Sequence, residues 1–135
     1  MSFLSKHSDT VYALLRVVAG FMFLFHGAQK LFGLFGDPNM MPPAGSQMWI
    51  GGIIELVAGV LVMIGLWTRW AAFVASGEMA VAYFQFHWKF AFTNAFFPIV
   101  NHGEMAVLYC FVFLYIATNG AGKWSFDGSM GKKKK

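Results

Sequence analysis

The chain has 135 residues, of which 58% are hydrophobic and 12% are charged, whereas soluble domains are about 45–50% apolar and about 25% charged. With a mean hydropathy of +0.57, it has too few polar groups to cover a water-facing surface, which disfavours a soluble enzyme, a disordered protein and a nucleic-acid binder. The formal net charge of +4 arises from the last four residues, Lys132 to Lys135, without which the chain is neutral.

Four apolar stretches follow one another along the chain, over residues 11–34, 48–67, 70–86 and 97–118. Each is long enough to cross a hydrocarbon layer of ~30 Å as a helix rising ~1.5 Å per residue. We therefore predict an all-α integral membrane protein, a four-helix bundle with one domain over residues 1–127 and a basic tail over residues 128–135. The first stretch lacks a small-residue cleavage site, so we expect a retained span rather than a signal peptide.

The distribution of Lys and Arg predicts the orientation of the bundle. With four spans, both termini and the turn at residues 66–70 lie on one side, which carries eight of the ten basic residues: Lys6, Arg16, Arg69, Lys123 and Lys132 to Lys135. The other side carries Lys89, and Lys30 lies within or near the membrane. The positive-inside rule then places both termini in the cytoplasm and the protein in the plasma (inner) membrane. The terminal lysine run is either an anchor for anionic headgroups or an unstructured tail.

Polar residues interrupt the apolar stretches and are the candidates for ligand binding or proton handling: His26, Gln29, Lys30, Glu55, Glu78, Asn101, His102 and Glu104. Ionisable groups within a membrane are costly and face the bundle interior. Counting from the outer end of each stretch, we expect one layer, about 10–14 Å deep at ~1.5 Å per residue, that contains His26, Glu55, Glu78 and Glu104.

Two interpretations of this layer remain open. It is either a buried ion-pair network that only fixes the packing of the helices, or a functional site that handles protons, a polar headgroup or a cation. We predict no metal site, because the Glu-x-x-His pair of di-iron bundles is absent and no pair of histidines stands out as haem ligands.

Several motifs, in order along most of the chain, resemble those of the DoxX family of small four-helix membrane proteins. The segment His26-Gly27-Ala28-Gln29-Lys30-Leu31-Phe32-Gly33, preceded by Arg16, resembles the family's HGxQKLFG motif. Further similarities are Glu55 with Gly59, the turn at residues 65–69, His87-Trp88, the 101–104 stretch, and residues 120–127, which resemble the closing GxGxxSxD motif.

The family name comes from subunits associated with a thiosulfate:quinone oxidoreductase, and relatives are linked to quinone or catechol resistance. The resemblance implies a membrane subunit of quinone-linked redox chemistry, in which the polar cluster binds a quinone headgroup or handles its protons. The alternative is a non-catalytic accessory subunit that packs against a larger membrane complex. A small transporter or ion leak is a third alternative, which the lack of an evident repeat disfavours.

The implied partners are the lipid bilayer and a membrane protein or further copies of the chain, with no nucleic acid. Quinone is the implied cofactor, and no tightly bound group is expected. At the cytoplasmic side, we expect Asp127 to form a salt bridge with Arg16 or Arg69 that joins the helix ends, because all three lie at that side of the bundle.

Overall fold

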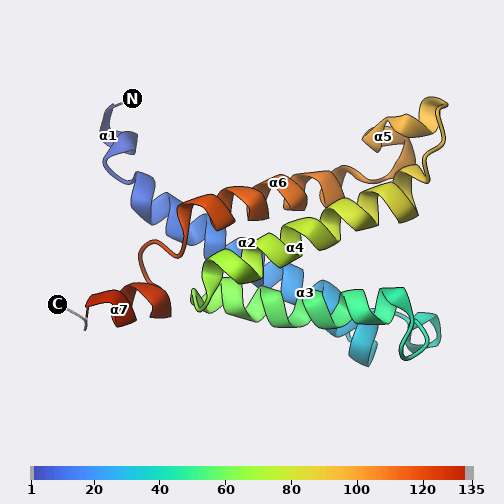
Figure 1. Cartoon of the computed structure of the whole chain (residues 1–135), viewed down its shortest axis with the longest axis horizontal. Helices are drawn as coiled ribbons and strands as arrows, with labels where there is room; N and C mark the ends of the chain where they lie inside the picture. The colour runs from blue at the N-terminus through green and yellow to red at the C-terminus, as the bar shows by residue number, and fades with distance from the viewer. Residues whose placement is uncertain (1, 133–135) are drawn as a thin grey trace.

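The computed structural model describes residues 2–132, and this part of the chain is helical, with no strand. Four longer helices form its body (Figure 1): α2 (Ser8–Phe32), α3 (Gln47–Ile64), α4 (Thr68–Ala82) and α6 (Glu104–Asn119). Helix α2 packs against α3, α3 against α4, and α4 against α6. The first three apolar stretches therefore form helices as predicted.

Both described ends of the chain lie at the same end of the molecule (Figure 1). This terminal end contains α1 (Ser2–Ser5), the turn between α3 and α4, and α7 (Phe126–Lys132). The opposite, loop end contains segments 33–46 and 83–103. Of the tail expected over residues 128–135, the part up to Lys132 is helical in α7, and residues 133–135 lie outside the described residues.

The loop end is made of short helical turns. Segment 33–46 contains η1 (Pro38–Met40), and segment 83–103 contains η2 (Tyr83–Trp88), η3 (Asn94–Phe96) and α5 (Pro98–Asn101). Helix α4 passes directly into η2, which is a π-helix, a form that occurs mostly as single turns within α-helices and frequently at functional sites.

The prediction of one helix over residues 97–118 is wrong, because the chain breaks between α5 and α6. His102 adopts a left-handed backbone with φ 58°, and the Asn101 side chain accepts a hydrogen bond from the Gly103 N–H at 2.8 Å. The same side chain donates to the Ala95 carbonyl oxygen, also at 2.8 Å. These local bonds replace the helical ones, so α6 begins only at Glu104.

Helices α2 and α3 touch through glycines. A Cβ at Gly20 would lie 2.5 Å from the Met63 nitrogen, and one at Gly59 would lie 2.6 Å from the Leu24 nitrogen. Such contacts are shorter than any real side chain allows, so these positions require glycine. Small residues at helix crossings are typical of membrane proteins, where close backbone packing replaces the hydrophobic effect between helices.

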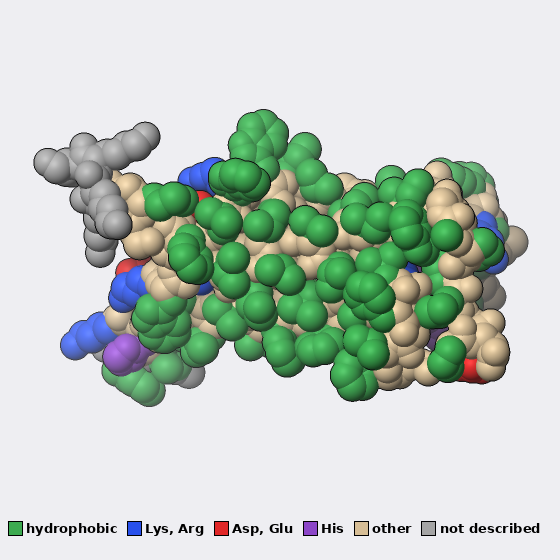
Figure 2. Space-filling view, turned by 90° about the horizontal axis from the view of Figure 1, so that it is seen from below, with side chains coloured by type: hydrophobic (Ala, Val, Ile, Leu, Met, Phe, Trp, Pro, Cys, Tyr) green, Lys and Arg blue, Asp and Glu red, His purple; other side chains and the backbone are tan. Residues whose placement is uncertain are grey.

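In the part of the chain that the structure describes, two helices, α2 and α3, are long and apolar enough to cross a membrane, and α6 is a shorter apolar helix. Only 39% and 28% of the apolar windows of α2 and α3 are buried within the molecule, which differs from the mostly buried core helix of a soluble protein. Figure 2 shows one face covered by hydrophobic side chains, with charged groups towards its two ends.

Candidate functional site

Lys30 and Glu55 form an ion pair between α2 and α3. Lys30 Nζ lies 2.7 Å from Glu55 Oε1, and the Glu55 side chain is only 4% exposed. An unpaired carboxylate in such a position would be very costly. Gly52, one turn before Glu55, allows α2 to approach α3 this closely. A Cβ at Gly52 would lie 3.0 Å from the Lys30 Cβ.

Glu78 reaches the same region from α4. Its Oε1 lies 3.0 Å from the place where a Cβ would stand on Gly51, so this glycine makes room for the carboxyl group. Glu78 is close enough to interact electrostatically with both Glu55 and Lys30. One cation thus faces two carboxyl groups, an arrangement that favours the binding or exchange of a proton.

Each of these two carboxyl groups has one buried oxygen, Glu55 Oε2 or Glu78 Oε2, that has no hydrogen-bond partner among the described residues. Leaving a buried polar atom unpaired costs about 1–3 kcal/mol. The polar cluster, by which we mean Lys30, Glu55 and Glu78, therefore retains capacity to hydrogen-bond a further group.

The polar cluster opens into a groove between α3 and α4, with a volume of about 570 Å³. Most of its wall is apolar, and its polar side chains include Lys30, Glu78 and His87. The full lining is Lys30, Gln47, Met48, Ile50, Gly51, Ile54, Phe73, Val74, Gly77, Glu78, Val81, Ala82, Phe86 and His87. Volume and lining are those of a site for a small molecule with an apolar body and a polar head.

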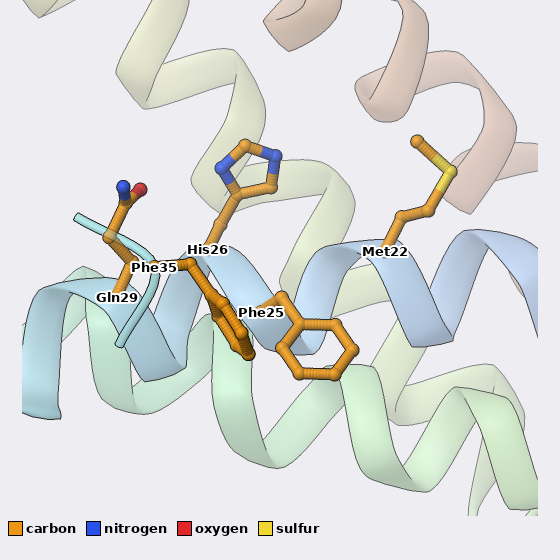
Figure 3. Close-up of a pocket in the computed structure, with 5 residues that line it drawn as sticks. All are labelled: Met22, Phe25, His26, Gln29 and Phe35. Carbon is orange, nitrogen blue, oxygen red and sulfur yellow. The ribbon is translucent and has the colours of Figure 1, made fainter. Parts of the chain in front are cut away.

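His26 and Gln29 do not line this groove. They line a second hollow, the α2 pocket, of about 350 Å³, together with Met22, Phe25 and Phe35. In Figure 3 these side chains stand along α2, with Phe35 from the following segment beside Phe25, their ring centroids 5.4 Å apart. The structure thus places the His26 and Lys30 side chains in different hollows.

The three remaining candidates lie at the loop end. The Asn101 side chain stabilises the backbone break before α6. The Asn101 backbone carbonyl oxygen lies 3.1 Å from His87 Nδ1. His102 is exposed, as is Glu104. The expected single layer of four groups is wrong for Glu104, because α6 begins at this residue and its side chain leaves from the first turn. No ion pair in residues 2–132 joins Glu104 to the polar cluster.

The salt bridge expected between Asp127 and an arginine is also absent from the described residues. Asp127 instead caps the start of α4. It accepts hydrogen bonds from the backbone N–H groups of Trp67 and Thr68, both at 2.9 Å, and from Thr68 Oγ1 at 2.8 Å. These orphan helix donors are natural partners of a carboxylate.

The two arginines bind carbonyl oxygens rather than Asp127. Arg16 is fully buried and donates to Val62, Met63, Lys123 and Trp124 at distances between 2.6 and 3.1 Å. Arg69 donates to three carbonyl oxygens of the last turn of α6, those of Ala117, Thr118 and Asn119. The terminal end is therefore held by side chain to backbone bonds.

Sequence reasoning missed Tyr109 and His87. Tyr109 is 7% exposed, its hydroxyl is buried without a partner, and it interacts electrostatically with Glu55. Its position in the repeat Ala106, Tyr109, Phe113, Ile116 on one face of α6 was a usable signal. For His87 the signal was its place in the family-like His87-Trp88 pair, but its direction into the groove depends on the π-helix η2.

No group of three or more His, Cys, Asp or Glu residues in the described part of the chain is arranged to hold a metal ion. The chemistry that the arrangement supports is hydrogen bonding and proton exchange by a lysine and two carboxyl groups beside an apolar groove.

Comparisons with known proteins agree with the motifs. A family model described as DoxX matches residues 11–88, a range that includes α3, α4, η2 and the whole polar cluster. The chain is also 39% identical over 143 residues to an uncharacterized protein of Haemophilus influenzae, with 98% of this chain and 100% of that protein covered. No solved structure matches.

Proposed function

The chain belongs to the DoxX family, and on this premise we propose that it is a quinone-associated membrane subunit whose α3–α4 groove takes a quinone. Family membership and the two apolar helices indicate a membrane protein. The proposal adds that α2, α3, α4 and α6 all cross the inner membrane as a four-helix bundle, with the terminal end in the cytoplasm.

The observation that carries the proposal is a polar cluster at the wall of an apolar groove. A quinone has two carbonyl oxygens, which accept hydrogen bonds, and an apolar tail. The Lys30 ammonium group and a protonated Glu78 are suitable donors to a carbonyl oxygen of the headgroup. The tail would lie along the apolar side chains of α3 and α4 that line the groove.

Reduction of a quinone to a quinol takes up two electrons and two protons. In this proposal the electrons come from a redox partner protein, and the protons from the carboxyl groups of the polar cluster. A carboxyl group paired with lysine can gain or lose a proton at modest cost, which explains why ionisable groups stand in an apolar wall.

Gly77 provides a direct test of the groove. It lines the groove, and a Cβ added there would meet nothing within 4 Å, so we expect the ring of Gly77→Phe to enter the open space of the groove and narrow it. We expect photoaffinity labelling by an azidoquinone to fall at least about tenfold, which corresponds to ~1.4 kcal/mol of binding free energy. Leu108→Phe, on the exposed face of α6, is the matched control and should label like the wild type.

Equal labelling of Gly77→Phe and the wild type would refute the groove as the quinone site. If a stoichiometric membrane partner then co-purified in mild detergent, the accessory role would replace the quinone role.

A further inference from the structure

Within residues 2–132, three buried oxygen atoms lack a hydrogen-bond partner, and they come from three different helices: Glu55 Oε2 on α3, Glu78 Oε2 on α4 and Tyr109 Oη on α6. Glu55 and Tyr109 are more than nine-tenths buried, with exposed fractions of 3% and 7%. At about 1–3 kcal/mol for each unpaired group, the three together are a large cost unless a shared partner satisfies them. Buried water commonly satisfies polar atoms that have no partner within the protein.

The side chains that carry these oxygen atoms adjoin two hollows. Glu78 lines the α3–α4 groove. On the other side, the ring of Tyr109 stands edge-on to the ring of His26, with centroids 6.2 Å apart, and His26 lines the α2 pocket. Glu55 links the two sides, because it interacts electrostatically with His26, Tyr109 and Glu78.

We propose that buried water molecules connect these atoms into a proton path that runs from His26 in the α2 pocket, past Tyr109 and Glu55, to Glu78 in the groove. The tyrosine hydroxyl passes a proton on by accepting one and releasing another, so its charge is unchanged. Lys30 remains paired with Glu55 and balances the charge along the path.

The role of the path in protonating a quinone rests on the proposed function. The path itself, from His26 to Glu78, does not depend on it. A quinone in the groove would cover Glu78 on that side with apolar groups, so protons for the headgroup would have to arrive from behind. The α2 pocket is suited to admit them, because His26 is exposed and Phe35 of the pocket belongs to segment 33–46 of the loop end.

Protonation of Glu78 can be measured without any quinone. Dicyclohexylcarbodiimide, an apolar reagent, adds to protonated carboxyl groups within membranes, and mass spectrometry quantifies the adduct. The ionisable groups that face Glu78 are Glu55 from α3, Lys30 from α2 and His87 from η2, while α6 contributes Tyr109 next to Glu55. The adduct that is lost in Glu78→Gln is the adduct on Glu78.

In right-side-out and inside-out vesicles with different pH on the two sides, we expect the Glu78 adduct to follow the pH of the compartment at the loop end. Tyr109→Phe keeps the ring and removes only the unpartnered hydroxyl, so it should fold and lose this dependence, as should His26→Ala. Tyr115→Phe, also on α6, and His102→Ala at the loop end are the matched controls and should keep it.

An adduct that follows the opposite compartment in the wild type would overturn the path. So would a Tyr109→Phe variant that responds like Tyr115→Phe. Because no quinone is present, these results are independent of the Gly77→Phe labelling experiment, and either proposal can fail without the other.

Discussion

Arg16 illustrates how much one buried side chain can hold together. Its guanidinium group joins the last turn of α3 to residues 123 and 124 through four carbonyl oxygens. A lysine at this position has no planar fork of donors and cannot reach both pairs of acceptors. We expect Arg16→Lys to lower the free energy of unfolding by about 2–4 kcal/mol, because charged hydrogen bonds contribute about 1.5–3 kcal/mol each.

Unfolding in mild detergent, followed by circular dichroism, measures this loss. Arg69→Lys is the control, because Arg69 also binds carbonyl oxygens but is exposed. An equal loss in the two variants would contradict the role assigned to burial.

Asp127 makes the terminal end sensitive to acid. Partial burial alone would raise the pKa of its carboxyl group, but the hydrogen bonds from Thr68 and Trp67, with the nearby charge of Arg16, hold that pKa below its ordinary value of 3.8. A carboxyl group whose pKa is lower in the folded state stabilises the fold above the unfolded pKa, and its contribution is lost as pH falls through the folded value.

We therefore expect the melting temperature to fall as pH drops below about 4, with a smaller fall in Asp127→Asn, which is already less stable at pH 7. Asp9→Asn removes an exposed carboxylate that lies 3.6 Å from Lys123 and should melt like the wild type. Parallel pH profiles of Asp127→Asn and the wild type would rule out the cap as the acid-sensitive group.

At the scale of single residues, the sequence predicts which polar residues are buried better than it predicts the groups to which they bond. Glu55 and Glu78 were predictable as members of one polar layer and Lys30 as a polar candidate, because a charged side chain on an apolar helix must face inward and be paired. The partners of Arg16 and Asp127 were not, because they are backbone groups at helix ends. Which of these orphan groups a side chain meets depends on the path of the chain in space.

The crossing of α2 and α3 depends on glycine at the scale of whole helices. A Cβ at Gly27 would lie 2.5 Å from the Gly52 carbonyl oxygen, so the two backbones must separate in Gly27→Ala. We expect a loss of about 1–3 kcal/mol, the usual cost of overpacking, measurable by unfolding titration with sodium dodecyl sulfate.

Gly77→Ala is the matched control for this crossing. It adds the same methyl group to a helix where nothing lies within 4 Å, and alanine is favoured over glycine in a helix by up to about 1 kcal/mol. A Gly27→Ala variant as stable as Gly77→Ala would show that the helices can move apart without cost.

Helix breaks were the part of the fold that hydropathy could not predict. Residues 97–118 are apolar almost throughout, and Asn101 and Glu104 are one turn apart, which favoured a single helix. The break arises from side chain to backbone bonds of Asn101 and from the left-handed His102. Side-chain hydrogen bonds that compete with the helical backbone bonds do not change the mean hydropathy of a segment, so hydropathy cannot predict the break.

The molecule as a whole is asymmetric along its length. At the terminal end, which contains α1, the α3–α4 turn and α7 (Figure 1), lie Lys6, Arg69, Lys123 and the Arg16 side chain bonded to residues 123 and 124, whereas Lys89 belongs to segment 83–103 of the loop end. Basic residues flanking spans favour the cytoplasmic side. The polar cluster and both hollows lie nearer the loop end, so in the proposed orientation a proton path from the α2 pocket would draw on the periplasmic side.

This orientation can be measured on the intact protein with two single-cysteine variants. In a Cys110→Ala background, Met40→Cys places a thiol in η1 at the loop end, and Met130→Cys places one in α7 at the terminal end; both native side chains are exposed. On intact cells, a membrane-impermeant maleimide should label the cysteine at position 40 and not that at position 130. Permeabilising the inner membrane should expose position 130, while the Cys110→Ala background alone stays unlabelled. The reverse pattern would place the terminal end outside, and the proton path would then start from the cytoplasm.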